Sequence, residues 1–365
     1  MSLIHSAATQ VAMIAGHPHA RRHHFKGPII PNLNPNPDSS FSTVPPNGDL
    51  NPYGVAVVPN GFPAGGSIHP GDTLVSNFNA ASNVQGTGTT IVDISPSGTR
   101  SVFFQNPNFP GLDTTLGILQ RGFVLVANTP TTLNSAGNLV PSGNGSLLIL
   151  NRDGNIVTTL SNPTLLNGPW GLTVNDLGGR AQVFVSNFYS GTVTRIDLSV
   201  PRHGDKFVVH SMVQIASGYA QRADPAAFWV GPTGLAYNSA KSVLYVASTD
   251  DNAIFAISNA ARTHSDQGKG SLVYQDPAHL RGPLGLVLAP NGDLLTSNGD
   301  AINGDPTQPS EIVEITPRGA YVGQLSVDSA QGAAFGLAVT TTKHRLTLAA
   351  VNDGTNTLDL RSMSF

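Results

Sequence analysis

Oxygen-bearing side chains recur at equivalent places in this 365-residue sequence, directly after short apolar runs that are typical of strands. Asn77, Asn128, Asn187, Asp250, Asp300 and Asp353 occupy these places. Ca²⁺ prefers such carboxylate and carbonyl oxygens and takes roughly six to eight of them. Asn or Asp after a strand also commonly bonds its own turn backbone. Both interpretations stay open, and for a metal site we choose Asp300, Asp250, Asn187 and Asn128, with Asp300 first.

A second group of residues could carry acid–base chemistry. His279 and Asp276 lie in one long predicted loop, and Asp224 lies in another. A carboxylate that orients an imidazole makes that imidazole a candidate general base. The spacing permits His279 as the base with Asp276 or Asp224 as its partner, without requiring it.

Aromatic residues stand before several repeated glycines of the chain. Tyr53, Trp170 and Phe335 do so, and Trp229 and Arg281 lie close to further copies. An apolar, aromatic-walled cavity with a few polar groups is the usual form of a small-molecule site. Aromatic residues that recur once per repeat also serve as packing between repeated units. A ligand-binding pocket and a packing role are therefore both open for these residues.

The elements that must position these groups form a repeated unit. A turn, a Gly and an alternating apolar strand recur six times, with the glycines 51 to 63 residues apart, at Gly54, Gly117, Gly171, Gly234, Gly285 and Gly336. Further strand-like runs follow each copy, which predicts a six-bladed β-propeller with four antiparallel strands in each blade. The chain is too short after Gly336 for a full last blade. We expect residues 39–44 to supply its fourth strand and close the ring.

The strand order also predicts where the loops lie. The loops that join second to third strands, and each blade to the next, share one side, which we call the top face. They are the longer loops, and long loops on a rigid scaffold commonly bind ligands. The oxygen-bearing and aromatic groups described above belong to this face.

The segment from Val185 to Asp197 carries the repeat most clearly, with a strand that ends in Val-Ser-Asn and a following Val-Thr-Arg-Ile-Asp strand. It resembles the NHL-repeat family of β-propellers, and the resemblance extends over residues of about 50 to 361. The turn aspartate of that family is mostly Asn here. Propellers include binding modules, lyases and lactonases, so the resemblance indicates the fold rather than an activity. The Glu-Gly-Pro-x-Trp phrase expected of the gluconolactonase group is missing.

Residues 1–38 are predicted to form an extended leader rich in His, Pro and Asn, and residues 39–365 the propeller. The leader contains His5, His17, His19, His23 and His24. Imidazoles suit copper, nickel and zinc, but short His-rich tracts are only a compositional hint, and we favour an exposed tail without a metal. Of the histidines outside the leader, the strand order places only His279 in a top loop. We therefore expect no three-histidine zinc site.

Composition narrows the class of protein. The net charge is −3 and the isoelectric point is near 6.4, so no positive field is available to hold nucleic acid or an anionic membrane. No apolar run approaches the length of a membrane span. Cysteine is absent, which excludes disulfides and thiol chemistry. The low charge and the abundance of polar small residues favour an exported protein, extracellular or periplasmic. We also expect a monomer.

We therefore expect an NHL-type β-propeller binding module whose top face binds a small molecule or a protein. The alternative is an enzyme that uses the same face. It would be a Ca²⁺-dependent lactonase or esterase, or a lyase that resembles virginiamycin B lyase.

Overall fold

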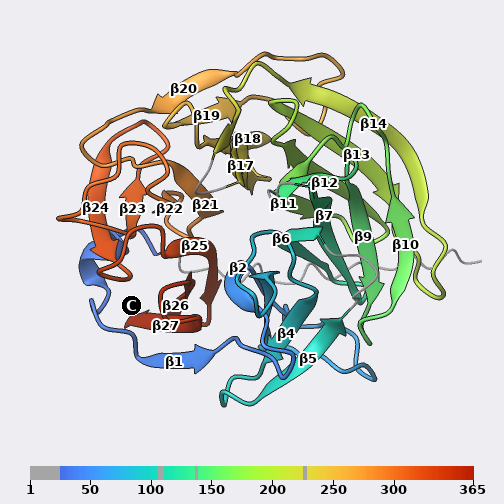
Figure 1. Cartoon of the computed structure of the whole chain (residues 1–365), viewed down its shortest axis with the longest axis horizontal. Coiled ribbons are helices and arrows are strands. Elements are labelled where there is room, and N and C mark those ends of the chain that lie inside the picture. Colours follow the sequence, from blue (N-terminus) through green and yellow to red (C-terminus); the bar gives the residue numbers. More distant parts are fainter. Residues whose placement is uncertain (1–24, 106–110, 136–138, 225–227) are drawn as a thin grey trace, which may run out of the picture.

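Six small antiparallel sheets stand in a ring around a central channel (Figure 1). The computed structural model describes residues 25–105, 111–135, 139–224 and 228–365. Each sheet has four strands in meander order, and β8 adds a short strand to the second blade. The predicted all-β, six-bladed propeller with four antiparallel strands per blade is confirmed.

The first three blades take the chain from residue 50 to residue 216. Blade 1 contains β2 (Leu50–Val57), β3 (Thr73–Asn79), β4 (Thr90–Ile94) and β5 (Arg100–Gln105). Blade 2 contains β6 (Gly111–Leu119), β7 (Phe123–Leu133), β9 (Ser146–Asn151) and β10 (Ile156–Leu160), with β8 (Leu139–Pro141) on β7. Blade 3 contains β11 (Pro169–Asp176), β12 (Arg180–Asn187), β13 (Thr192–Ser199) and β14 (Val208–Ala216).

The other three blades follow a short hairpin of β15 (Arg222–Asp224) and β16 (Phe228–Val230). Blade 4 contains β17 (Pro232–Asn238), β18 (Val243–Ser248), β19 (Ala253–Ile257) and β20 (Ser271–Tyr274). Blade 5 contains β21 (Pro283–Leu288), β22 (Leu294–Asn298), β23 (Glu311–Ile315) and β24 (Tyr321–Ser326). Blade 6 contains β25 (Ala334–Thr341), β26 (Arg345–Asn352), β27 (Thr357–Ser364) and β1 (Ser39–Ser42).

The two ends of the chain close the ring together, as predicted. Strand β1 pairs antiparallel with β27, with Ser39 opposite Leu360 and Ser42 opposite Thr357. The blue β1 and the dark red β27 lie side by side in Figure 1. This pairing covers the outer edge of β27, and unpaired sheet edges are sites of unwanted association.

Part of the segment assigned to the leader is packed into the protein. A short 3-10 helix, η1 (Ile30–Asn32), contacts β24 of blade 5. Ile29 and Ile30 are buried. Their backbone N–H groups donate to the carboxylate of Glu314 at 2.7 to 3.0 Å. The five leader histidines lie outside the described residues.

Five of the six repeated glycines are required where neighbouring blades approach each other. In blade 2 the pairing of β6 with β7 puts Thr115 at the equivalent position, and Gly117 lies two residues further along the strand. A Cβ atom on Gly171 would lie 1.8 Å from the carbonyl oxygen of Thr233, and one on Gly336 would lie 1.9 Å from that of Tyr53. The Ser186 hydroxyl accepts from the Gly171 N–H at 2.8 Å and donates to the Thr233 carbonyl at 2.7 Å. The repeated glycine therefore indicates a close contact between two blades as well as the start of an inner strand.

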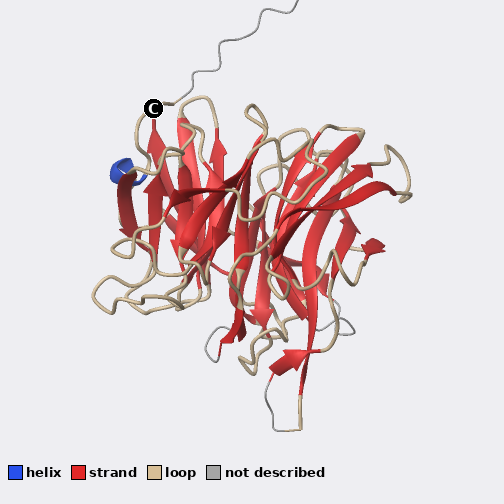
Figure 2. Cartoon of the chain, turned by 90° about the horizontal axis from the view of Figure 1, so that it is seen from above, coloured by secondary structure: helices blue, strands red, loops and turns tan. Residues whose placement is uncertain are grey.

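The core is divided among the blades. Buried apolar side chains form separate clusters shared by adjacent sheets, such as Leu125 with Val185, and Leu74 with Val126. Figure 2 shows strands running between two faces formed by loops. In the described residues no helix is long and apolar enough to cross a membrane.

Candidate functional site

A cavity of about 350 Å³ opens at the top end of the central channel, and we call it the mouth pocket. The inner strands of the blades begin at this end of the channel. The second strands finish at the same end, and the loops that follow them contribute to the lining. Its aromatic lining consists of Tyr53, Phe78, Trp170, Trp229 and Phe335. Its polar lining consists of Asn51, Gln85, Asp300, Gln331 and Asp353. The four aromatic residues predicted to bind a ligand, Tyr53, Trp170, Trp229 and Phe335, thus lie around one cavity.

The aromatic wall is held by specific contacts. The indole Nε1 of Trp170 donates to the Tyr53 hydroxyl at 2.6 Å, and the two rings are nearly perpendicular, with centroids 5.4 Å apart. Phe335 stacks on the other side of Tyr53 at 5.0 Å. Burial raises the pKa of Tyr53 well above its ordinary value, so the phenol stays neutral. The wall is therefore a preorganised, uncharged surface.

Asp353 is the least compensated acid of the pocket. It follows β26, and its backbone N–H donates to the carbonyl of Ala333 at 2.9 Å. In the described part of the chain, no hydrogen-bond donor reaches its carboxylate. Burial raises the pKa of Asp353 to about 6. The side chain is thus ionised at neutral pH, at a cost in folding free energy.

Asp300 presents a second carboxylate, and its orientation is fixed. Its Oδ2 accepts from the backbone N–H groups of Ser310 and Gly332, both at 2.9 Å. Its Oδ1 is buried without a partner among the described residues, as is Oδ1 of Asn51. Both residues have a left-handed backbone, with φ of 54° and 59°. Local strain of this kind is common at binding sites.

Replacing Asp353 by Asn is expected to stabilise the protein at neutral pH. Because the folded pKa of Asp353 is raised, its contribution to stability is most favourable below the unfolded pKa and is lost as pH rises towards 6. Asp353→Asn should raise the free energy of unfolding at pH 7.5 by about 1–3 kcal/mol, with a much smaller change at pH 4. Urea unfolding of both proteins at the two pH values measures this. An equal change at both would contradict it.

The residues predicted to ligate a metal are dispersed. Asp300 lines the mouth pocket. Asp250 accepts from Nε of Arg222 at 2.9 Å. Asn187 donates to two threonine hydroxyls of its own blade, and Asn128 is buried on β7. No group of three His, Cys, Asp or Glu side chains within the described ranges could hold a metal ion. This donor set does not fit a Ca²⁺ site, and we derive no metal-dependent step.

The predicted acid–base residues lie away from the mouth pocket. Asp276 Oδ2 lies 2.6 Å from Nδ1 of His279, and this contact lowers the pKa of Asp276. The His279 ring stacks on Tyr321 of the outer strand β24, with centroids 3.8 Å apart. Asp224 instead accepts from Arg222 at 2.7 Å. His279 and Asp276 are thus brought together without Asp224, at the outer strands.

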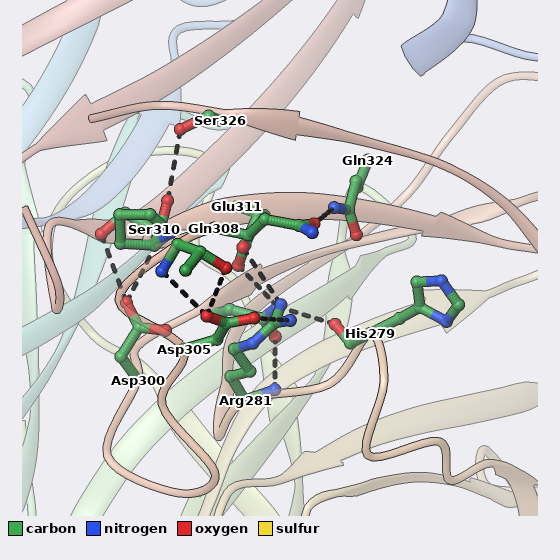
Figure 3. A network of polar contacts seen from close by, with 12 residues as sticks. His279, Arg281, Asp300, Asp305, Gln308, Ser310, Glu311, Gln324 and Ser326 are labelled. Atoms are coloured by element: carbon green, nitrogen blue, oxygen red, sulfur yellow. Dashed lines mark hydrogen bonds and ion pairs between the residues drawn. The ribbon is translucent and has the colours of Figure 1, made fainter. Parts of the chain in front are cut away.

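Arg281 was predicted to contact a ligand, and the structure places it in an ion-pair network (Figure 3). Its side chain is 4% exposed and donates to Glu311 at 3.0 Å and to Asp305 at 3.3 Å. Asn298 also donates to Glu311, at 3.2 Å. In Figure 3 the ring of His279 points away from this network. Arg281 does not belong to the lining of the mouth pocket.

Several lining residues were missing from the predicted sites. Asp353 occupies the place after a second strand, like Asp300, but the sixth copy of the repeat is loose. Phe78 follows Asn77 as Phe188 follows Asn187, a signal that a comparison of the copies could have shown. Nothing in the sequence distinguishes Asn51, Gln85 or Gln331 from other polar loop residues.

Comparison with known proteins finds the fold but no close relative. No protein-family model and no curated protein matches the sequence. A calcium-binding protein, regucalcin, from Agrobacterium tumefaciens superposes with a TM-score of 0.51 and 13% identity over 88% of this chain and 92% of that one. A luciferin-regenerating enzyme gives 0.49 and 12% over 89% and 94%. The gluconolactonase XC5397 from Xanthomonas campestris gives 0.47 and 13% over 94% and 99%.

Likeness at this identity establishes the shared fold and no activity. The regucalcin comparison covers most of both chains, so the shared fold extends over most of the propeller. Membership of the NHL-repeat family stays a prediction.

Proposed function

We propose that this chain is a ligand-binding β-propeller and that a small molecule binds in the mouth pocket. The observation that carries the proposal is the combination of one concave aromatic wall with two carboxylates, of which Asp353 has no donor in the described structure. A mainly apolar cavity with a few convergent polar groups is the form that small-molecule sites take. The aromatic side chains would bury the body of the ligand, and the carboxylates and amides would orient it.

The lower part of the channel is a poorer candidate. It holds a larger cavity of about 430 Å³, lined mainly by apolar side chains of the inner strands, such as Val55, Leu172 and Leu286. None of the described residues that line it carries a charged side chain. A ligand there would gain burial but little orientation, and specificity depends on polar groups placed at defined positions.

Intrinsic fluorescence tests the proposal directly, because both tryptophans of the chain line the mouth pocket. We expect members of a library of small amines, alcohols, carboxylates and sugar lactones to change the tryptophan emission. The same compounds should raise the melting temperature, since a ligand at a hundredfold excess over its Kd stabilises the folded state by about 2.7 kcal/mol.

A substitution that fills the cavity is the control. Ala301 lines the pocket, and Ala301→Phe should abolish both responses. Ala64→Phe places the same side chain on an exposed loop elsewhere and should change neither. If no compound of the library alters the emission, or if Ala301→Phe leaves the responses unchanged, the mouth pocket is not the binding site.

A Ca²⁺-dependent lactonase or esterase is the second candidate, and a lyase similar to virginiamycin B lyase would use the same face. One observation favours it: Asp300, Asp353 and Asn51 bring three potential oxygen ligands to one cavity. This is fewer than the roughly six to eight that Ca²⁺ takes. Addition of Ca²⁺ to metal-stripped protein, in the same fluorescence and melting assays, separates the candidates. A Ca²⁺ response that Asp300→Ala removes would favour the enzyme.

A further inference from the structure

The charge of the mouth pocket indicates the chemical class of the ligand, an inference that rests on the proposed function. Asp300 and Asp353 both line the cavity, and the described residues of its lining include no Lys, Arg or His. Carboxylates held in a partly dehydrated cavity are costly unless a positive group or several donors compensate them. The described residues supply no positive group at the mouth pocket.

Three other buried carboxylates of this protein have compensating partners, whereas Asp93 keeps an unpartnered Oδ1. Glu311 is paired with Arg281 at 3.0 Å. Glu314 accepts two backbone N–H groups at the N-terminal segment. Asp359 accepts from two hydroxyls, at 2.7 and 3.0 Å. Asp353 has no such partner among the described residues, so its position is explained if the counter-charge arrives with the ligand.

Two further observations favour an organic cation over a bare metal ion. The wall is aromatic, and the faces of Trp, Tyr and Phe rings attract cations, Trp most strongly. The unpartnered atoms of the lining residues Asp300 and Asn51 are acceptors, Oδ1 in each, and both are buried in the wall. A protonated amine carries N–H donors for the carboxylate of Asp353, which is partly exposed, and its hydrocarbon part would cover the rings.

We propose that the mouth pocket binds an organic ammonium ion, a protonated primary amine with a small aromatic or aliphatic body. Its ammonium group binds the carboxylate of Asp353, and the second carboxylate, Asp300, adds negative charge to the same cavity. Its body lies against Trp170, Trp229 and Phe335. A neutral or anionic molecule of the same shape leaves the carboxylate of Asp353 uncompensated and is rejected.

Matched probes test this proposal. Phenethylamine, 2-phenylethanol and phenylacetate share a ring and differ in charge, and excitation at 295 nm reports on the two tryptophans alone. We expect phenethylamine to bind at least about tenfold more tightly than either of the others at pH 7.5, since a hydrogen bond to a charged group is worth more than one tenfold step in affinity.

Variants that remove one charge locate the effect. Asp353→Asn should weaken phenethylamine binding at least about tenfold and leave 2-phenylethanol unchanged. Asp153→Asn removes the same charge from an exposed turn after β9 and should change neither. Melting curves confirm that both variants are folded.

The outcomes separate the class of ligand from the existence of the site. Equal or tighter binding of the alcohol or the acid, or an Asp353→Asn protein that keeps full affinity for the amine, overturns the ammonium assignment but keeps the pocket. A fluorescence response to Ca²⁺ alone, with none to phenethylamine, also overturns it. If no probe and no library compound binds, the proposed function fails as well.

Discussion

Removing residues 1–37 is expected to lower the free energy of unfolding by on the order of 5 kcal/mol, although β1 is kept. The truncation removes the buried side chains of Ile29, Ile30 and Leu33, and each such side chain is worth about 1.5–3 kcal/mol. It also removes the two N–H groups that donate to Glu314, which has no exposed surface in the full chain. Urea unfolding of the full and shortened chains measures the loss.

A substitution at Glu314 provides the control. In the full chain, Glu314→Gln replaces an acceptor of the Ile29 and Ile30 N–H groups by an amide N–H, and should cost about 1–3 kcal/mol. In the shortened chain those donors are gone. Glu314 then keeps a single donor, the side-chain amide of Asn291 at 3.1 Å, and repels Asp293, whose pKa burial and Glu314 raise to about 6. There Glu314→Gln should be neutral or stabilising, and a similar loss in both chains would contradict the proposed contact.

Replacing Arg281 by Met is expected to cost about 3–5 kcal/mol, because it leaves Glu311 buried without its positive partner. Burial already raises the pKa of Glu311, and Arg281 opposes that rise. In the Arg281→Met protein the carboxyl should take up a proton more readily, so the loss should be smaller at pH 5 than at pH 7.5. Unfolding curves at both pH values test the magnitude and its sign.

The double variant tests whether the pair explains this loss. Arg281→Met with Glu311→Gln keeps an acceptor for Asn298 without the buried charge, and should recover most of the stability. Since Arg281 does not line the mouth pocket, the folded Arg281→Met protein should keep its affinity for phenethylamine. If the double variant is no more stable than Arg281→Met alone, the cost has another origin.

The repeat was readable from the sequence because its cause lies at one position in five of the six blades. A glycine stands where a carbonyl of the next blade leaves no room for a Cβ, as at Gly171 and Thr233, and the alternating strand follows at once. That contact recurs at every repeated glycine except Gly117, where a Cβ would meet the Leu172 side chain instead. Blade number, strand order and the closure by β1 follow from counting the copies. The aromatic side chains before the glycines could be predicted to meet for the same reason, since the inner strands all begin at the channel mouth.

The partners that compensate the charged side chains do not recur from blade to blade. Only the tertiary structure decided which charges have a partner. Asp250 and Asp300 occupy equivalent places in the sequence, yet Asp250 meets Arg222 and Asp300 meets two backbone N–H groups at the pocket. In the sequence, Arg281 and Asp353 look like ordinary surface charges. The fold buries Arg281 against Glu311, and it leaves Asp353 without a donor among the described residues. The sequence determined the scaffold because its contacts repeat locally. The site was decided by which distant, non-repeating groups reach each charge.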